Sequence, residues 1–203
     1  MDFLQRIDLG SILIQYAVLL FSLSLHEASH AWMADRCGDY TARYMGRVTL
    51  NPLAHMDPIG TVLFPLLQFF TRLPLIGWAK PVPVNPVHLR NPRRDQMLVS
   101  LAGPGSNLLV AAAAFVILAA LKIGFPQAGS MILDMALALF NLIPIPPLDG
   151  HWLLYGVLPY NSARALARVG AYGTILLYGL MILGVFRYVF IPVHWALFLL
   201  IAL

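Results

Sequence analysis

Long apolar runs dominate the chain, and short polar and proline-rich stretches separate them. A transmembrane helix needs about 20 mainly apolar residues. Four runs meet or approach that length, at about residues 9–31, 97–121, 131–157 and 170–203. The run 59–73 is too short to cross a membrane by itself, and Pro65 lies in its middle. We expect this run to re-enter the membrane or to lie at a shallow depth.

The stretch between residues 74 and 97 follows a different pattern, because its prolines forbid a regular helix. Alternation over residues 80–84 is compatible with an edge strand, where proline is tolerated. The fold expected is therefore an all-α polytopic membrane protein with about four to five transmembrane helices, the short segment 59–73, and a short β-like segment near residues 78–86. No internal repeat or linker divides the chain. We expect one domain over 1–203, with a catalytic core at about 9–157 and C-terminal helices at about 165–203.

Composition supports the membrane class. The 203 residues are 60% apolar and 11% charged, whereas soluble domains carry about 25% charged residues. The net charge of +4 comes from basic residues scattered through the loops, which favours membrane orientation over nucleic-acid binding. The single cysteine, Cys37, excludes an intramolecular disulfide and a multi-cysteine zinc cluster.

Candidate chemistry begins at the end of the first run, in the sequence LHEASHAW. His26 and His30 are four residues apart, so a helix places both imidazoles on one face, where they can reach one metal ion. Glu27, which is the only glutamate in the chain, could hold the attacking water. This is the zinc hydrolase pattern of two histidine ligands and a glutamate base. Ionisable groups inside a membrane span are costly and usually mark a functional site.

A catalytic zinc ion normally has three protein ligands, and no second glutamate is present to supply the third. Only two acids, Asp134 and Asp149, lie within apolar runs. Asp149 follows a proline-rich break, and irregular backbone at membrane depth must be buried or line a cavity. Asp149 is therefore well placed to turn towards a metal. Asp134 is expected to be a solvated acid near the start of a helix.

The paired motifs HEASH and NLIPIPPLDG resemble those of the site-2 protease family of intramembrane zinc metalloproteases. NPLAHMDPIGT, GWAKPVPVNP and LAGPGSN also fit the family, and together the motifs cover most of residues 22–151. The resemblance implies one Zn²⁺ per chain, bound by His26, His30 and Asp149, with Glu27 activating water. It also implies that Asn107 lies beside the active site and helps to bind substrate or to stabilise the oxyanion.

GWAKPVPV resembles the membrane-associated β-segment of that family. Such a segment could bind a locally unwound substrate by strand addition, and the residues concerned are Lys80, Pro81, Val82, Pro83 and Val84. The alternative is a plain cytosolic loop. The expected partners are a transmembrane protein substrate and the lipid bilayer, with no nucleic acid. The expected reaction is hydrolysis of a peptide bond in or near a transmembrane segment of that substrate.

The topology follows from the depth of the two motifs. If His26 and Asp149 bind one ion, their helices run in the same direction, and the chain between them crosses the membrane an odd number of times. Ten of the 13 basic residues then fall on the side reached after the first run. The positive-inside rule places that side, and the opening of the site, in the cytosol of a prokaryote, with the chain in the cytoplasmic membrane. The alternative function is a non-catalytic zinc transporter or sensor in the membrane.

Overall fold

The computed structural model describes residues 9–71, 77–120, 129–170, 172–185, 188 and 191. These residues form eight α-helices, one short 3-10 helix and one π-helix, and no strand is present among them. The helices are α1 (Leu9–Arg36), α2 (Thr41–Tyr44), α3 (Phe64–Thr71), α4 (Pro92–Ala120), α5 (Gly129–Asn141), α6 (Gly150–Val157), α7 (Tyr160–Gly170) and α8 (Gly173–Ile182). The predominantly helical fold is thus confirmed for the described residues.

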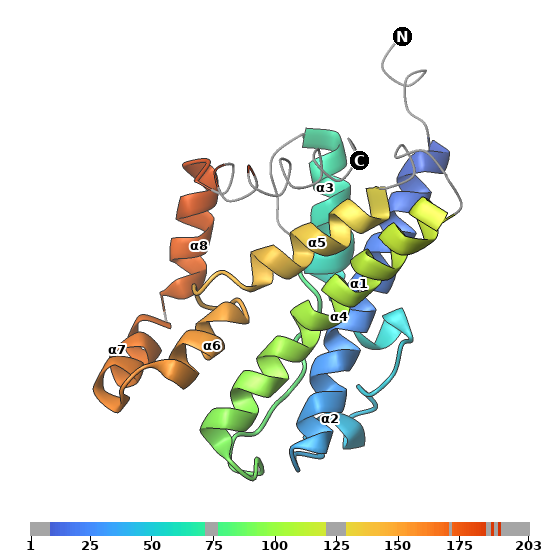
Figure 1. Cartoon of the computed structure of the whole chain (residues 1–203). Coiled ribbons are helices and arrows are strands. Elements are labelled where there is room, and N and C mark those ends of the chain that lie inside the picture. Colours follow the sequence, from blue (N-terminus) through green and yellow to red (C-terminus); the bar gives the residue numbers. More distant parts are fainter. Residues whose placement is uncertain are drawn as a thin grey trace.

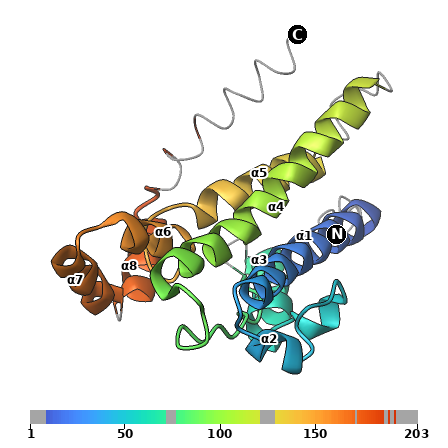
Figure 2. The ribbon, with the colours of Figure 1, turned by 60° about the horizontal axis from the view of Figure 1, so that its bottom comes forward.

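Three helices, α1, α4 and α5, pack together and position the site. Helix α4 runs in the direction opposite to α1 and α5 (Figures 1 and 2). The side chains buried between the helices are mostly small, and they include Ala28, Ala31, Ala34, Ala111, Ala138, Ser22, Ser24 and Ser100. Small side chains let helix backbones approach closely, which is the usual way in which helices pack within a bilayer.

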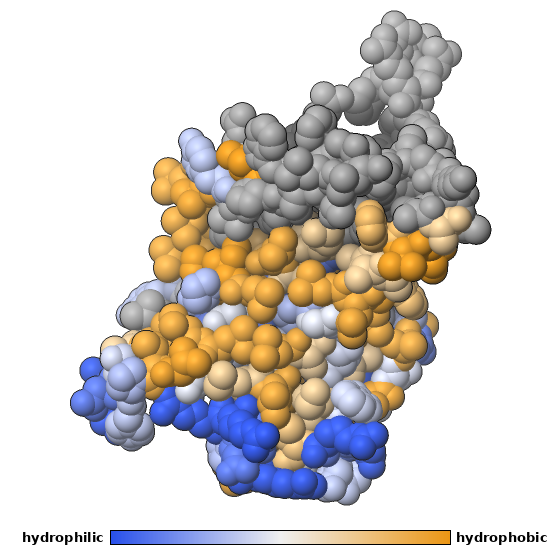
Figure 3. All heavy atoms as spheres, viewed as in Figure 1, coloured by the Kyte–Doolittle hydropathy of each residue, from blue (hydrophilic) through white to orange (hydrophobic). Residues whose placement is uncertain are grey.

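Large apolar side chains of the same helices point outwards. Leu13, Ile14, Leu109, Val116 and Ile117 are each more than half exposed. In the space-filling view, apolar residues cover the middle of the visible face and hydrophilic residues gather at its lower end (Figure 3). Soluble monomers rarely expose apolar patches of such extent. An outer surface of this kind suits contact with lipid.

One helix of the described residues, Pro92–Ile117, is long and apolar enough to cross a membrane. The bent pair Tyr160–Arg168 and Gly173–Ile182, at 69° to one another, would qualify as a second span if it crosses as one unit. The expected count of four to five spans is therefore not confirmed for the described residues. Part of the last expected span, residues 192–203, lies outside them.

The short apolar run that begins near residue 59 starts and ends beside the same part of the chain. Asp57 begins it by accepting hydrogen bonds from the backbone N–H groups of Ile59 and Gly60, at 3.0 and 2.7 Å. The π-helix Pro58–Leu63 and α3 then lead away. The chain returns at Trp78, whose N–H donates to the Gly60 carbonyl oxygen at 3.2 Å. The chain thus leaves beside Gly60 and is next to the same residue again at Trp78, as expected of a re-entrant segment.

The β-like segment near residues 78–86 was predicted wrongly, since no strand is formed there. The N–H groups of Trp78, Lys80 and Val82 donate to the Gly60 carbonyl, the His55 carbonyl and the Glu27 carboxylate. These acceptors come from two separate parts of the chain, and one of them is a side chain, so they do not form the regular ladder of a partner strand. Pro81 and Pro83 have no N–H group with which to build a ladder on the other edge.

A buried aspartate joins the end of α1 to the segment that precedes α4. The Asp39 carboxylate accepts hydrogen bonds from the N–H and hydroxyl of Thr41, at 3.0 and 2.5 Å, and from the N–H of Asn85, at 2.6 Å. Burial by itself would raise the pKa of Asp39, but these hydrogen bonds outweigh burial and hold the pKa below its ordinary value. Asp39 thus fixes the C-terminal end of the 77–85 segment.

Candidate metal centre and active site

Helix α1 presents two imidazoles to the interior of the bundle. His26 and His30 are only 4% and 7% exposed, and one helical turn separates them. They face Gly103 of α4, whose missing side chain leaves room for both rings. The spacing of four residues in the sequence therefore places the two imidazoles side by side, as predicted.

The third candidate ligand, Asp149, comes from a break between two helices. Helix α5 ends at Asn141 and α6 begins at Gly150, because the prolines between them remove backbone donors. A Cβ atom on Gly150 would lie 2.1 Å from the Leu142 carbonyl oxygen, so only glycine fits this close approach. The tight return of the chain carries Asp149 to the two histidines.

The three candidate ligand atoms form a compact triangle. His26 Nε2 lies 3.0 Å from His30 Nε2 and 3.1 Å from Asp149 Oδ2, and the distance from His30 Nε2 to Asp149 Oδ2 is 3.2 Å. Two ligands of a tetrahedral zinc ion lie roughly 3.3 Å apart, given bond lengths of about 2.0–2.1 Å. Two imidazoles and a carboxylate at this spacing fit such an ion. Within the described part of the chain, this is the group that meets the requirement for a metal site.

Each histidine is oriented through its second ring nitrogen. His30 Nδ1 lies 2.6 Å from the Val99 carbonyl oxygen, and His26 Nδ1 lies 2.7 Å from Asn107 Oδ1. Both partners are acceptors, so both Nδ1 atoms donate and both Nε2 atoms keep a free lone pair. Hydrogen bonds of this kind are the usual support of histidines that bind metal ions.

Asn107 therefore lies behind His26, on the side of the ring away from Asp149. Its amide nitrogen donates to the Ser22 carbonyl oxygen at 3.3 Å and to Asp134 Oδ1 at 3.1 Å. The side chain is fully buried. The family resemblance implied that Asn107 lies beside the active site, and in the structure it contacts His26. Its contacts are with a ligand, however, and both of its N–H groups are already engaged in this arrangement.

Asp134 was expected to be solvated, and this expectation is wrong. The residue is 2% exposed, and its carboxylate accepts from Asn107. Asp134 lies in the second turn of α5, where the helix packs on α4. The sequence signal that could have identified it is the occurrence of an acid inside an apolar run, because such acids are usually buried in the bundle.

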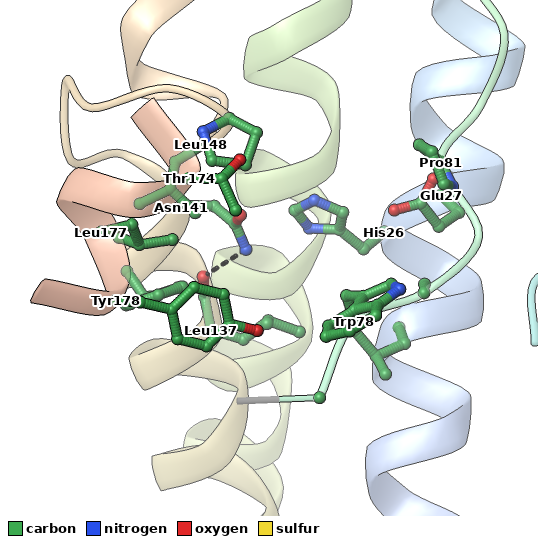
Figure 4. Close-up of a pocket in the computed structure, with 15 residues that line it drawn as sticks. His26, Glu27, Trp78, Pro81, Leu137, Asn141, Leu148, Thr174, Leu177 and Tyr178 are labelled. Atoms are coloured by element: carbon green, nitrogen blue, oxygen red, sulfur yellow. Dashed lines mark hydrogen bonds between the residues drawn. The ribbon is translucent and has the colours of Figure 1, made fainter. Parts of the chain in front are cut away.

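Two cavities meet at the site. One of about 420 Å³ is lined mainly by apolar side chains of α1, α5 and α8, and another of about 300 Å³ contains the ligand triangle. His26, Glu27 and Asn141 line both cavities. Figure 4 shows His26 and Glu27 extending from α1, with Pro81 beside Glu27 and Asn141 across the pocket. Glu27 thus borders the space beside the ligands, where a base could act.

The 80–84 segment covers Glu27. The N–H of Val82 donates to Glu27 Oε2 at 3.1 Å, and Pro81, Val82 and Val84 line the cavity that contains the ligands. Lys80 does not line this cavity, and its backbone carbonyl accepts from the buried Arg47. Burial lowers the pKa of Arg47, and the charge of Glu27 acts in the opposite direction. The sequence did not single out Arg47, which holds this segment in place.

Asn141 is a further site residue that the sequence reasoning missed. It is the last residue of α5, and one amide N–H donates to the Leu137 carbonyl oxygen at 2.9 Å (Figure 4). The amide lies on the wall that both cavities share. The available signal was a polar side chain three residues before the first proline of the break, within an apolar run.

Comparison with known proteins agrees with this geometry. The chain is 37% identical over 187 residues to Putative zinc metalloprotease YwhC of Bacillus subtilis, which covers 86% of this chain and 82% of that protein. The chain belongs to this zinc metalloprotease family. It is also 32% identical over 200 residues to Putative zinc metalloprotease Rip2 of Mycolicibacterium smegmatis, covering 92% of this chain and 73% of the relative. The Rip2 protein of Mycobacterium tuberculosis is 34% identical over 178 residues, covering 83% and 66%. No family model and no solved structure matches the chain. His26, His30 and Asp149 form a set of donors that suits a zinc ion, in keeping with the names of these relatives.

Proposed function

We propose that the chain is an intramembrane zinc endopeptidase that hydrolyses a peptide bond in or near a transmembrane segment of another membrane protein. The observation that carries the proposal is the convergence of His26, His30 and Asp149 beside Glu27, at the junction of two cavities in a helical bundle. Membership of a zinc metalloprotease family supports the same reaction.

Zn²⁺ bound by His26, His30 and Asp149 would supply a Lewis acid that polarises the peptide carbonyl and makes water acidic enough to attack near neutral pH. Glu27 accepts the proton of the attacking water and then donates it to the leaving amine. The N–H of Val82 orients one oxygen of Glu27, which leaves the other oxygen available for this transfer.

The setting of the site supports a membrane substrate. Apolar side chains cover the outside of the bundle, and the larger cavity has mainly apolar walls. A transmembrane helix hides its peptide bonds, so a substrate must unwind before cleavage. Residues Lys80–Val84 would hold the unwound substrate, with the carbonyl groups of Pro81 and Pro83 as acceptors. This segment lacks a strand partner among the described residues.

The proposed location is the cytoplasmic membrane of a prokaryote, with several spans and the site opening to the cytosol. The end of α1, the start of α4 and helix α7 carry Arg36, Arg93 and Arg164 at one end of the molecule (Figure 1). The positive-inside rule assigns that end to the cytosol. A cysteine-accessibility map that placed residues 40–55 outside the cell would contradict this orientation.

The test compares wild type with Glu27→Gln, after each protein is co-reconstituted with a panel of tagged single-span membrane proteins. We expect wild type to bind one zinc ion per chain and to cleave at least one member of the panel. Glu27→Gln should keep the zinc and lose at least about 100-fold in rate, because general acid–base catalysis contributes that much or more. Cleavage at the wild-type rate by Glu27→Gln would refute the mechanism.

A second pair of variants tests the metal centre. Asp149→Ala should lose zinc, as measured by metal analysis of the purified protein, whereas Asp95→Asn should retain it. Asp95 is also buried, but it accepts from the Asn91 N–H at the start of α4 and makes no contact with the ligands. If wild-type proteoliposomes transported zinc and cleaved nothing, the transporter alternative would replace the protease.

A further inference from the structure

A polar chain crosses the interior of the bundle and joins three helices. It runs from His26 of α1 through Asn107 of α4 to Asp134 of α5, with heavy-atom distances of 2.7 and 3.1 Å. Asn107 and Asp134 are 0% and 2% exposed. Burying an amide and an acid in an apolar bundle is costly unless each is hydrogen-bonded. A pair of this kind calls for a functional explanation.

The direction of the hydrogen bonds is the important property of this chain. An asparagine amide has one end that donates and one that accepts, and rotation by half a turn exchanges them. A carboxylate only accepts, so Asp134 attracts the Asn107 nitrogen and turns the Asn107 oxygen to His26. The proton of His26 then belongs on Nδ1, and its Nε2 lone pair points at His30 and Asp149.

His30 needs no such arrangement. Its Nδ1 faces the Val99 backbone carbonyl at 2.6 Å, and a carbonyl can only accept. For His26 the partner is an amide that could present either end. The Ser22 carbonyl also accepts from the Asn107 nitrogen, but at 3.3 Å and without charge. Hydrogen bonds to an ionised group are roughly twice as strong as neutral ones, so Asp134 is the stronger determinant.

We propose that Asp134 is a positioning residue that fixes the orientation of Asn107 and, through it, the tautomer of His26 that binds metal. The inference rests on the zinc site of the proposed function. It assigns Asp134 no contact with substrate, and it explains why an acid lies buried in α5 two hydrogen bonds away from His26.

The test measures zinc affinity by chelator competition and requires no substrate. Asp134→Leu should weaken zinc binding about tenfold, at the lower end of the effect of removing the support of a metal ligand. Asp134→Asn should weaken it less, because its amide can present either end to Asn107. Asp95→Asn, the buried acid remote from the site, should bind zinc like wild type.

An exchange of the two residues separates orientation from packing. In the double variant Asn107→Asp and Asp134→Asn, the carboxylate accepts directly from His26 Nδ1 and the new amide donates to it. Zinc affinity should return to within about threefold of wild type, since charged and neutral hydrogen-bond partners are both present again. A purely structural role for Asp134 predicts no gain from the exchange over Asp134→Asn alone.

The outcomes can be told apart. Thermal unfolding of the zinc-free proteins identifies any variant that fails to fold. Should the double variant fail, the affinities of the single Asp134 variants decide. Wild-type affinity in Asp134→Leu and Asp134→Asn would overturn the inference. If wild type binds zinc but cleaves no membrane protein, the proposed protease fails while the role of Asp134 can still be measured.

Discussion

Gly103 offers the sharpest test of the metal centre, because the space beside it holds both histidine ligands. A Cβ atom added to Gly103 would lie 2.4 Å from His30 Nε2 and 2.7 Å from His26 Nε2. Ordinary contact begins at 3.4 Å, so Gly103→Ala overlaps these atoms by about 1.0 and 0.7 Å. At this position on α4 an added methyl group would therefore meet both ligand nitrogens.

The overlap is large relative to what a metal site tolerates. Metal–ligand distances hold to within about 0.2 Å, and a misplacement of about 1 Å can cost 100-fold in activity. We expect Gly103→Ala to weaken zinc binding at least about 100-fold. Activity in any cleavage assay should fall in parallel. The stability of helix α4 should not decrease, since alanine is a better helix former than glycine by about 1 kcal/mol.

Gly105→Ala is the matched control. Gly105 lies two residues along the same helix, and a Cβ atom there meets nothing within 4 Å. Both variants would be purified in detergent, and their zinc affinity would be measured by chelator competition alongside thermal unfolding without zinc. The geometry of the site would be refuted if Gly103→Ala bound zinc like wild type. Equal losses in the two variants would refute it as well.

Two further predictions concern substrate handling and stability. Asn141→Leu should keep its zinc but lose about 100-fold in kcat/KM, because a fixed amide on the cavity wall is available to stabilise developing charge; loss of zinc instead would show a structural role. Asp39→Ala should lower the free energy of unfolding by about 3 kcal/mol at neutral pH, since it removes the acceptor of Thr41 and Asn85. The pKa of Asp39 lies below its unfolded value, so its contribution is present above the unfolded pKa and is lost as pH falls through the folded pKa. Thermal unfolding of the two proteins should therefore converge in acid, and a constant difference at every pH would contradict this.

The sequence by itself determined the parts of the site that depend on local geometry. A spacing of four residues places His26 and His30 on one face of any helix. Glu27 is the neighbour of His26 in the sequence, so it lies at the same level of the helix. The three prolines shortly before Asp149 interrupt the helix that the apolar run would otherwise form, because they remove backbone donors. Apolar runs with little charge predict a helical bundle with an apolar outer surface. These inferences need only backbone geometry and the cost of burying charge.

Only the tertiary structure decided how distant polar groups meet. Asp134 and Asn107 are 27 residues apart, and Asn107 and His26 are 81 apart. Which amide atom faces which partner depends on how α1, α4 and α5 pack. The 77–85 segment illustrates the same limit, because alternation predicted a strand there. Its N–H groups instead donate to acceptors in two other parts of the chain, the stretch 55–60 and the side chain of Glu27. Periodicity reports which positions share a face, whereas the partner across that face is set by contacts between segments far apart in the chain.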